Sequence, residues 1–200
     1  MRYCKNFITS ASRHTGSYFY LLFFSFFLII LYSDALHAQG SLVRYFDKIE
    51  YDDEWNRIVR PAFAMSDPVM DEIYMIEGNG RIIIYSSDLF PLHSLGKSDK
   101  IERPEGLAVD PDGNLYVAQS YSENYPRQRI SVFNPRLKWM RDIYLEGFEG
   151  AEAFVPYRLD IDKNKNIYVV GIYSAGVLVL DSNYNLIDVM YHEEDDKKVK

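Results

Sequence analysis

One stretch of the chain decides the fold: residues 103–134, RPEGLAVDPDGNLYVAQSYSENYPRQRISVFN. It opens with a proline and an apolar run. A tight polar turn follows at 110–114, then the apolar-Tyr-apolar segment LYV at 115–117 and a second β-rich segment, ISVF, at 130–133. Aspartate and glycine in such a turn favour a hairpin, because aspartate caps the backbone and glycine adopts positive φ. The stretch therefore predicts consecutive antiparallel strands.

The same order of features occurs three times, after Pro61, Pro104 and Pro156. Each proline is followed six residues later by an aspartate and then by a strand with a central tyrosine; the tyrosines are Tyr74, Tyr116 and Tyr168. Further strands are predicted at 82–85, 130–133 and 177–180, and looser fourth strands at 89–95, 140–145 and 186–190. The prolines are 43 and 52 residues apart. This period is typical of four-stranded β-propeller blades rather than of helical repeats.

Residues 103–134 resemble an NHL repeat, whose pattern runs from a proline through Gly-Leu-Ala-Val-Asp, a Gly-Asn turn and Tyr-Val-Ala to an Arg-Ile-x-Val-Phe strand. The flanking copies keep only the skeleton of this pattern. NHL propellers tend to carry Asp directly after Tyr-Val-Ala, whereas here Gln119 takes that place, with Glu77 and Gly171 in the other copies. The resemblance implies an all-β fold, an incomplete NHL-type propeller of about three four-stranded blades after an N-terminal signal helix.

The first 38 residues have the layout of a secretion signal. Arg2, Lys5 and Arg13 precede an apolar run at 18–32, and small residues follow it, so cleavage is predicted after Ala35 or Ala38. The apolar run would span only about 22 Å as a helix, less than a bilayer core of about 30 Å, which favours cleavage over a membrane anchor. Either way, the remainder is predicted to be secreted or periplasmic, or anchored and facing out of the cytoplasm.

The predicted organisation follows from these features: a signal segment at 1–38, an N-terminal edge strand or linker at 39–59, propeller blades at 60–102, 103–154 and 155–190, and a charged tail at 191–200. Removing residues 1–38 leaves 19 basic and 28 acidic residues, a net charge of −9. Such a surface argues against nucleic-acid partners, and it leaves the N-terminal segment, if uncleaved, as the membrane contact.

Three blades are half of the six that the NHL resemblance implies, and an open array exposes sheet edges. Three interpretations stay open: the chain is truncated relative to a longer ancestor, which we favour; two chains pair as a homodimer that completes the ring; or the array is capped by its own ends.

Catalytic motifs are missing. The only cysteine is Cys4, and His93 and His192 are the only histidines after residue 38, so we expect no catalytic residues, no metal site and no cofactor. Glu105-Gly106 is similar to the metal-binding Glu-Gly of gluconolactonase-type propellers, which makes a metal-dependent lactonase-like hydrolase the alternative. A non-functional truncated remnant is a further alternative.

Binding of a protein or glycan ligand is the favoured function. Residues 121–128 form an insertion between the second and third strands of the middle repeat, and 146–155 is a second long segment. Tyrosine, arginine and amide groups at a loop tip combine flat apolar area with hydrogen-bonding ends. The candidate ligand-binding residues are Tyr121, Glu123, Asn124, Tyr125 and Arg127, together with Glu105 from the alternative.

Overall fold

The computed structural model describes residues 47–67, 69–172 and 176–191. The predicted signal segment and most of the predicted charged tail lie outside these residues. Strands dominate the described chain, and its only helical turn is the short 3-10 helix η1, Lys97–Asp99. Within that part, no helix has the length and apolar character needed to span a membrane.

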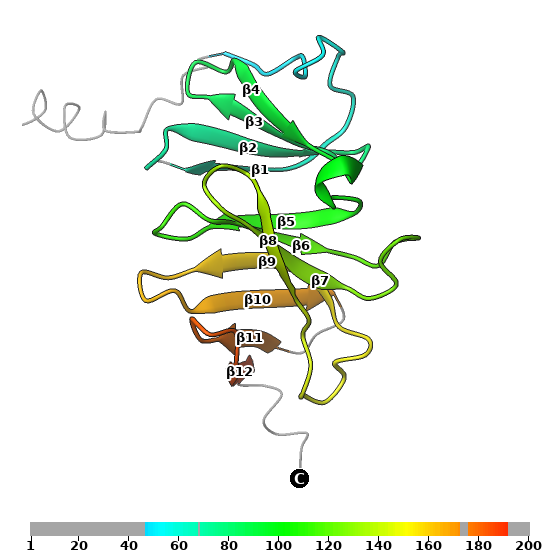
Figure 1. The fold of residues 1–200 in the computed structure, drawn as a ribbon, viewed down its shortest axis with the longest axis vertical. Coiled ribbons are helices and arrows are strands. Elements are labelled where there is room, and N and C mark those ends of the chain that lie inside the picture. The colour runs from blue at the N-terminus through cyan, green and yellow to red at the C-terminus, as the bar shows by residue number, and fades with distance from the viewer. Residues whose placement is uncertain (1–46, 68, 173–175, 192–200) are drawn as a thin grey trace, which may run out of the picture. The chain divides into compact units, whose positions relative to one another are not determined.

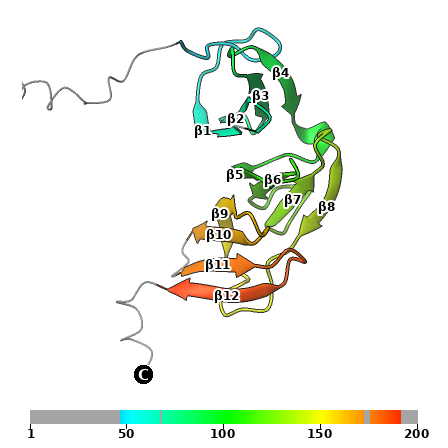
Figure 2. The same ribbon diagram turned by 90° about the vertical axis from the view of Figure 1, so that its left-hand side faces the viewer.

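The strands form three four-stranded antiparallel sheets, here called blades one, two and three (Figures 1 and 2). In each blade the strands are neighbours in the order in which they occur in the sequence. Blade one contains β1 (Pro61–Asp67), β2 (Glu72–Glu77), β3 (Ile82–Ser86) and β4 (Pro91–Leu95). Blade two contains β5 (Pro104–Val109), β6 (Leu115–Gln119), β7 (Arg129–Phe133) and β8 (Trp139–Ile143). Blade three contains β9 (Val155–Ile161), β10 (Ile167–Ile172), β11 (Gly176–Leu180) and β12 (Leu186–Tyr191).

The repeated prolines lie at or next to the start of each first strand, as the sequence predicts. Pro61 and Pro104 begin β1 and β5, and Pro156 is the second residue of β9. In all three blades the pairing with the second strand shifts by one residue next to this proline. Proline cannot donate to the hydrogen-bond ladder, so strand starts and bulges are the places where it is tolerated.

The turns between first and second strands confirm the predicted capping. Asp110 Oδ1 accepts hydrogen bonds from the backbone N–H groups of Asp112 and Asn114, both at 2.9 Å. Asp162 Oδ1 accepts the equivalent bonds at 2.8 and 2.9 Å. Gly113 has a φ of 81°, the left-handed conformation that glycine adopts without steric cost.

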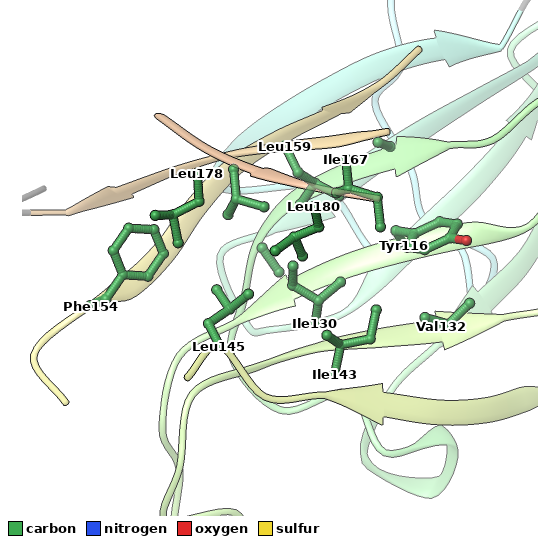
Figure 3. Packing of buried hydrophobic residues seen from close by; sticks show 13 residues of the cluster. Tyr116, Ile130, Val132, Ile143, Leu145, Phe154, Leu159, Ile167, Leu178 and Leu180 are labelled. Carbon is green, nitrogen blue, oxygen red and sulfur yellow. The ribbon is translucent and has the colours of Figure 1, made fainter. Parts of the chain in front are cut away.

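Two apolar cores lie between the blades. One is shared by blades one and two, and the other by blades two and three, where Figure 3 shows Tyr116, Ile130 and Val132 near Leu159 and Leu180. The interpretation that the repeated tyrosine packs between neighbouring blades is correct for Tyr74 and Tyr116, which are 4% and 5% exposed. It is wrong for Tyr168, because the flanking Ile167 and Val169 point into the core and alternation turns Tyr168 to the other face.

The described part of the predicted edge strand or linker, residues 47–59, joins no sheet. It folds back through a single β-bridge between Tyr51 and Arg57. Ile49 and Ile58 pack against a buried cluster of Met75, Ile83 and Tyr85, on the face of blade one that is turned away from blade two. These residues therefore cover a sheet face rather than extend a sheet edge, because their apolar side chains find more contact there.

Asp52 anchors this segment. It is 3% exposed, and its carboxylate accepts hydrogen bonds from the backbone of Glu54 and Asn56 and from Arg81 Nη2 at 2.7 Å. Burial acts to raise the pKa of Asp52, but the hydrogen bonds from Asn56 and Glu54 and the charge of Arg81 outweigh it and hold that pKa below its ordinary value. The charged form is thus the one that the fold stabilises.

Replacing Asp52 by Asn tests this anchor. Because the folded-state pKa is depressed, the contribution of the carboxylate is present above the unfolded value of about 3.9 and is lost as the pH falls through the lower folded value. Near neutral pH, we expect Asp52→Asn to lower the free energy of unfolding by about 1 to 2 kcal/mol. In urea titrations the difference from the parent should narrow as the pH falls below about 3.9. A difference independent of pH would contradict the ionic anchor.

Candidate functional site

Blade two contains a buried polar cluster at the end of β6 and the start of β7. Gln119 is fully buried, and its Nε2 donates to the Lys100 carbonyl at 3.1 Å and to Ser131 Oγ at 2.7 Å. Its Oε1 accepts a hydrogen bond from the Glu102 backbone at 3.0 Å. Gln119 therefore ties the crossover between β4 and β5 to the sheet. At the position where the NHL pattern has Asp, these hydrogen bonds are made by an amide.

Arg129 is the centre of the same cluster and is 0% exposed. Its Nη2 donates to the Lys100 carbonyl at 3.0 Å, its Nε lies 3.5 Å from Asp142 Oδ1, and its guanidinium carbon lies 3.6 Å from the ring centroid of Tyr125. Burial lowers the pKa of Arg129 below its ordinary value, and the charge of Asp142 opposes that shift. An arginine nevertheless remains charged in a protein, so this is a buried cation paired with one carboxylate.

In the other two blades, the residues at the positions of Gln119 and Arg129 also hold the segment that leads into the blade. The contacts that they make differ in chemistry. In blade one, Arg81 pairs with Asp52 and Asp53, and Ser94 Oγ donates to Asp53 at 2.6 Å. In blade three, Gly171 occupies the position of Gln119, and any side chain there would collide with the Phe154 ring of the incoming crossover. Ion pairs, buried hydrogen bonds and an aromatic contact thus perform the same task in successive blades.

The two long segments that the sequence singled out lie against each other. Arg127 forms an ion pair with Glu146, and its guanidinium carbon lies 4.6 Å from the ring centroid of Tyr144. Gln128 Nε2 donates to the Glu152 carbonyl at 3.0 Å. We call residues 121–128 and 144–154 together the loop rim. Nothing in the sequence reveals that these segments meet, because they are separated by two strands.

A hollow of about 870 Å³ opens between the two segments of the loop rim. Arg127, Gln128, Glu146 and Phe148 are among the residues that line it. Phe148 packs edge to face on the buried ring of Phe154, with centroids 5.4 Å apart, which gives the wall an apolar base. Charged and amide groups above an apolar floor suit a polar ligand with a flat apolar surface.

Five of the six predicted site residues belong to the loop rim. Tyr121 is 55% exposed, and Arg103 lies 5.5 Å from its ring centroid. Glu123, Asn124 and Arg127 are exposed, and Asn124 Nδ2 donates to Glu102. Tyr125 differs from the prediction, since it is half-buried over Arg129 and supports the cluster beneath the loop.

Glu105 lies apart from these residues. It is half-buried on β5, and its backbone carbonyl accepts a hydrogen bond from Arg158. In the part of the chain that the structure describes, no three His, Cys, Asp or Glu side chains gather as metal ligands, around Glu105 or elsewhere. Among the described residues, Glu105 is therefore not part of a group of metal ligands.

Sequence reasoning missed Arg129, Ser131 and Asp142. The repeat gives a signal only for Arg129, because Arg81 directly precedes β3 and Arg129, at the equivalent position, is the first residue of β7. A charged residue that recurs beside fully buried strand residues is a candidate for a paired role.

Solved structures decide the architecture. The RRP9 WD40 repeats superpose with a TM-score of 0.51 at 12% sequence identity, covering 70% of this chain and 41% of that one. The chain has a β-propeller fold. Two further matches have lower TM-scores: the β-propeller domain of Myceliophteria thermophila Cps50 (Swd1), and luciferin-regenerating enzyme. Their TM-scores are 0.48 and 0.46 at 11% and 13% identity, with 72% and 66% of this chain and 43% and 46% of theirs covered.

The chain spans less than half the length of these solved structures. No protein-family model and no curated protein matches the sequence. At this level of identity the likeness shows the fold alone, so the site has to be argued from its own geometry.

Substitutions of Arg127 and Arg129 test whether the loop rim and the buried polar cluster contribute differently to stability. Arg129→Ala should lower the free energy of unfolding by about 3 kcal/mol or more, because it removes the buried ion pair with Asp142 and the hydrogen bond to the Lys100 carbonyl. Arg127→Ala should cost less than about 1 kcal/mol, because its ion pair is exposed. Urea unfolding of both variants measures the difference, and equal losses would contradict the assignment.

Proposed function

We propose that this chain is an exported, NHL-like β-propeller fragment that binds a protein or glycan ligand through the loop rim and has no catalysis of its own. The observation that carries the proposal is the meeting of the two inserted segments through Arg127, Gln128, Glu146 and Glu152. Neither segment is needed to close a blade, yet together they form a hollow with polar walls. Loops held on a rigid sheet scaffold are common binding surfaces.

The chemistry of the loop rim favours ligands that offer flat apolar surface and hydrogen-bonding groups. Tyr121 and Tyr144 are 55% and 41% exposed and carry phenol groups at the ends of rigid rings. Arg127 and Glu146 supply one charge of each sign. Sugars and extended peptides both present this combination, because they have apolar faces edged by hydroxyl or amide groups.

Export and the NHL assignment rest on the sequence. The basic, apolar and small-residue order of residues 1–38 supports secretion or a periplasmic location, with a membrane anchor as the alternative if the segment stays uncleaved. The blade-two motif at 103–134 supports the NHL type within the propeller fold.

The hydrolase alternative has no comparable support. It would require Glu105 to share a metal ion with further oxygen ligands, and the described residues bring none into such a group. The remnant alternative predicts a chain that is degraded rapidly after synthesis, so the yield of soluble protein separates it from the binding proposal.

Tyr121→Ala tests the loop rim directly. We would apply the purified chain to a printed glycan array and to a random peptide display library, and then measure affinities for the best hit by titration calorimetry. Tyr121→Ala should weaken binding by about tenfold or more, equivalent to about 1.4 kcal/mol, since an exposed tyrosine at a binding surface often dominates its energy.

Tyr51→Ala is the matched control, because Tyr51 is 45% exposed on the separate 47–59 segment. It should leave the same titration unchanged. Hits that survive Tyr121→Ala and Arg127→Ala, or an absence of hits from both libraries, would argue against the loop rim as a binding site.

A further inference from the structure

One buried carboxylate oxygen of blade one has no hydrogen-bond donor. Asp67 ends β1 and is 6% exposed, and its Oδ1 accepts hydrogen bonds from the backbone N–H groups of Val69 and Met70 at 2.8 and 3.4 Å. Its Oδ2 is buried as well, and no group of the described residues donates to it. A buried acceptor without a donor is costly, because it has lost its hydrogen bonds to water.

The equivalent aspartates of the other two blades have donors at this oxygen. Asp110 Oδ2 accepts hydrogen bonds from Asn114 Nδ2 at 2.8 Å and from the Tyr116 hydroxyl at 3.3 Å. In blade three, Asp162 Oδ2 accepts the equivalent bonds from an asparagine and a tyrosine at 2.9 and 3.2 Å. The unpaired oxygen of Asp67 is thus an exception to a contact that the repeat otherwise keeps.

A difference between the repeats explains this exception. Asn114 and Asn166 each stand two residues before the repeated tyrosine, and in blade one Glu72 stands at that position. A carboxylate accepts hydrogen bonds and does not donate them, and Glu72 takes the bond from the Tyr74 hydroxyl at 2.7 Å. Asp67 therefore lacks both of the donors that the other two turns supply.

Asp67 also lines a pocket of about 340 Å³ between the first strands of the blades. These strands, β1, β5 and β9, lie next to one another (Figure 2). Most of the lining side chains are apolar, among them Phe63, Met65 and Leu107. Phe63, Met65 and Asp67 alternate along β1 and so lie on one face of it. The volume is at the lower end of the range for small-molecule pockets, about 300 to 1,000 Å³, which limits the ligand to one ring or a short chain.

The pocket is acidic. Asp160 on β9 is a second carboxylate in its lining, and no Lys, Arg or His is among the described residues that line it. The guanidinium carbon of Arg158 lies 4.6 Å from the Phe63 ring centroid, but its Nη1 donates to the backbone carbonyls of Glu105 and Tyr157. The pocket therefore favours a ligand that brings both a positive charge and an N–H donor.

We propose that this pocket binds a small primary amine. The ammonium group donates to Asp67 Oδ2, and the carboxylates of Asp67 and Asp160 balance its charge. Such a charge-assisted hydrogen bond is about twice as strong as one between neutral groups. The apolar body of the amine packs on Phe63, Met65 and Leu107. This site shares no residue with the loop rim, so it is a second binding site on the same chain.

The first experiment titrates the purified chain by calorimetry with benzylamine, 2-phenylethylamine and n-hexylamine, each beside the alcohol of the same skeleton. At least one amine should bind about tenfold or more tightly than its alcohol, because only the ammonium group makes the charge-assisted bond. Asp67→Asn should remove that advantage, because it keeps the oxygen that caps the turn and replaces Oδ2 by an amide. Asp71→Asn is the matched control, since Asp71 is an exposed carboxylate of the same turn outside the pocket lining, and it should leave the affinity unchanged.

Three results of this titration would overturn the proposal. One is that no amine binds more tightly than its alcohol. Another is that Asp71→Asn weakens binding as much as Asp67→Asn does, because charge alone would then attract the amine. The third concerns lysine, whose side chain carries the same ammonium group: tighter binding of N-acetyl-lysine amide than of all three amines would replace a small amine by a lysine of a peptide.

The second experiment compares the thermal unfolding of variants without ligand. Asp67→Asn should keep or raise the Tm, because it removes an unpaired buried charge. Asp110→Asn should lower the Tm, because the new amide faces the donors Asn114 and Tyr116. Glu72→Asn gives blade one the amide of the other turns, so it should raise the Tm and abolish amine binding. Equal loss of Tm in Asp67→Asn and Asp110→Asn, or unchanged amine binding by Glu72→Asn, would contradict an unpaired Asp67 Oδ2.

Discussion

A four-stranded sheet with apolar residues on both faces cannot bury either face by itself. The packing of one sheet on the next is therefore the contact on which this structure depends. The buried positions of β2, β3, β6 and β7 are consecutive along each strand and mostly apolar, which is typical of strands covered on both sides. Blade two has a neighbour on each face. Blade one has a neighbour on one face and the 47–59 segment on the other. Blade three has one described neighbour.

The segments that lead into the three blades are held by contacts that differ in chemistry but occupy one position. A buried arginine and a buried glutamine bind a carbonyl in blade two, an arginine binds two aspartates in blade one, and a phenylalanine ring lies over a glycine in blade three. A buried charge is costly unless it is paired, and Arg129 is paired with the Asp142 carboxylate and donates one hydrogen bond to the Lys100 carbonyl. Fixing the crossovers also fixes the loop rim, because its segments leave the sheets beside these contacts.

Much of the fold could be predicted from sequence because its signals are local. The prolines, the Asp-capped turns and the apolar-Tyr-apolar strands each depend on a few adjacent residues, and all appear at the expected places. The insertion at 121–128 was found in the same way, by comparing lengths between repeats. The position of Tyr168 was predicted wrongly, because alternation fixes which face a residue occupies but not whether a neighbouring sheet covers that face.

Features that depend on contacts between distant residues could not be predicted. The covering role of residues 47–59 requires knowing that a sheet face nearby is open, and its apolar residues are equally compatible with an edge strand. The cluster around Arg129 joins residues from β6, β7, β8 and a crossover, and a single sequence contains no record of such pairings. Whether Arg127 and Glu146 meet is likewise decided only when the strands between them have formed.

Native-state hydrogen exchange tests the central claim most directly. It should be measured on the parent chain, at a concentration where the chain is monomeric. If stability comes from faces buried between sheets, amides of β6 and β7 should exchange slowest, near the rate of global unfolding, and amides of β10 and β11 should exchange faster through partial opening. Equal protection in all three blades, or the weakest protection in blade two, would contradict the account.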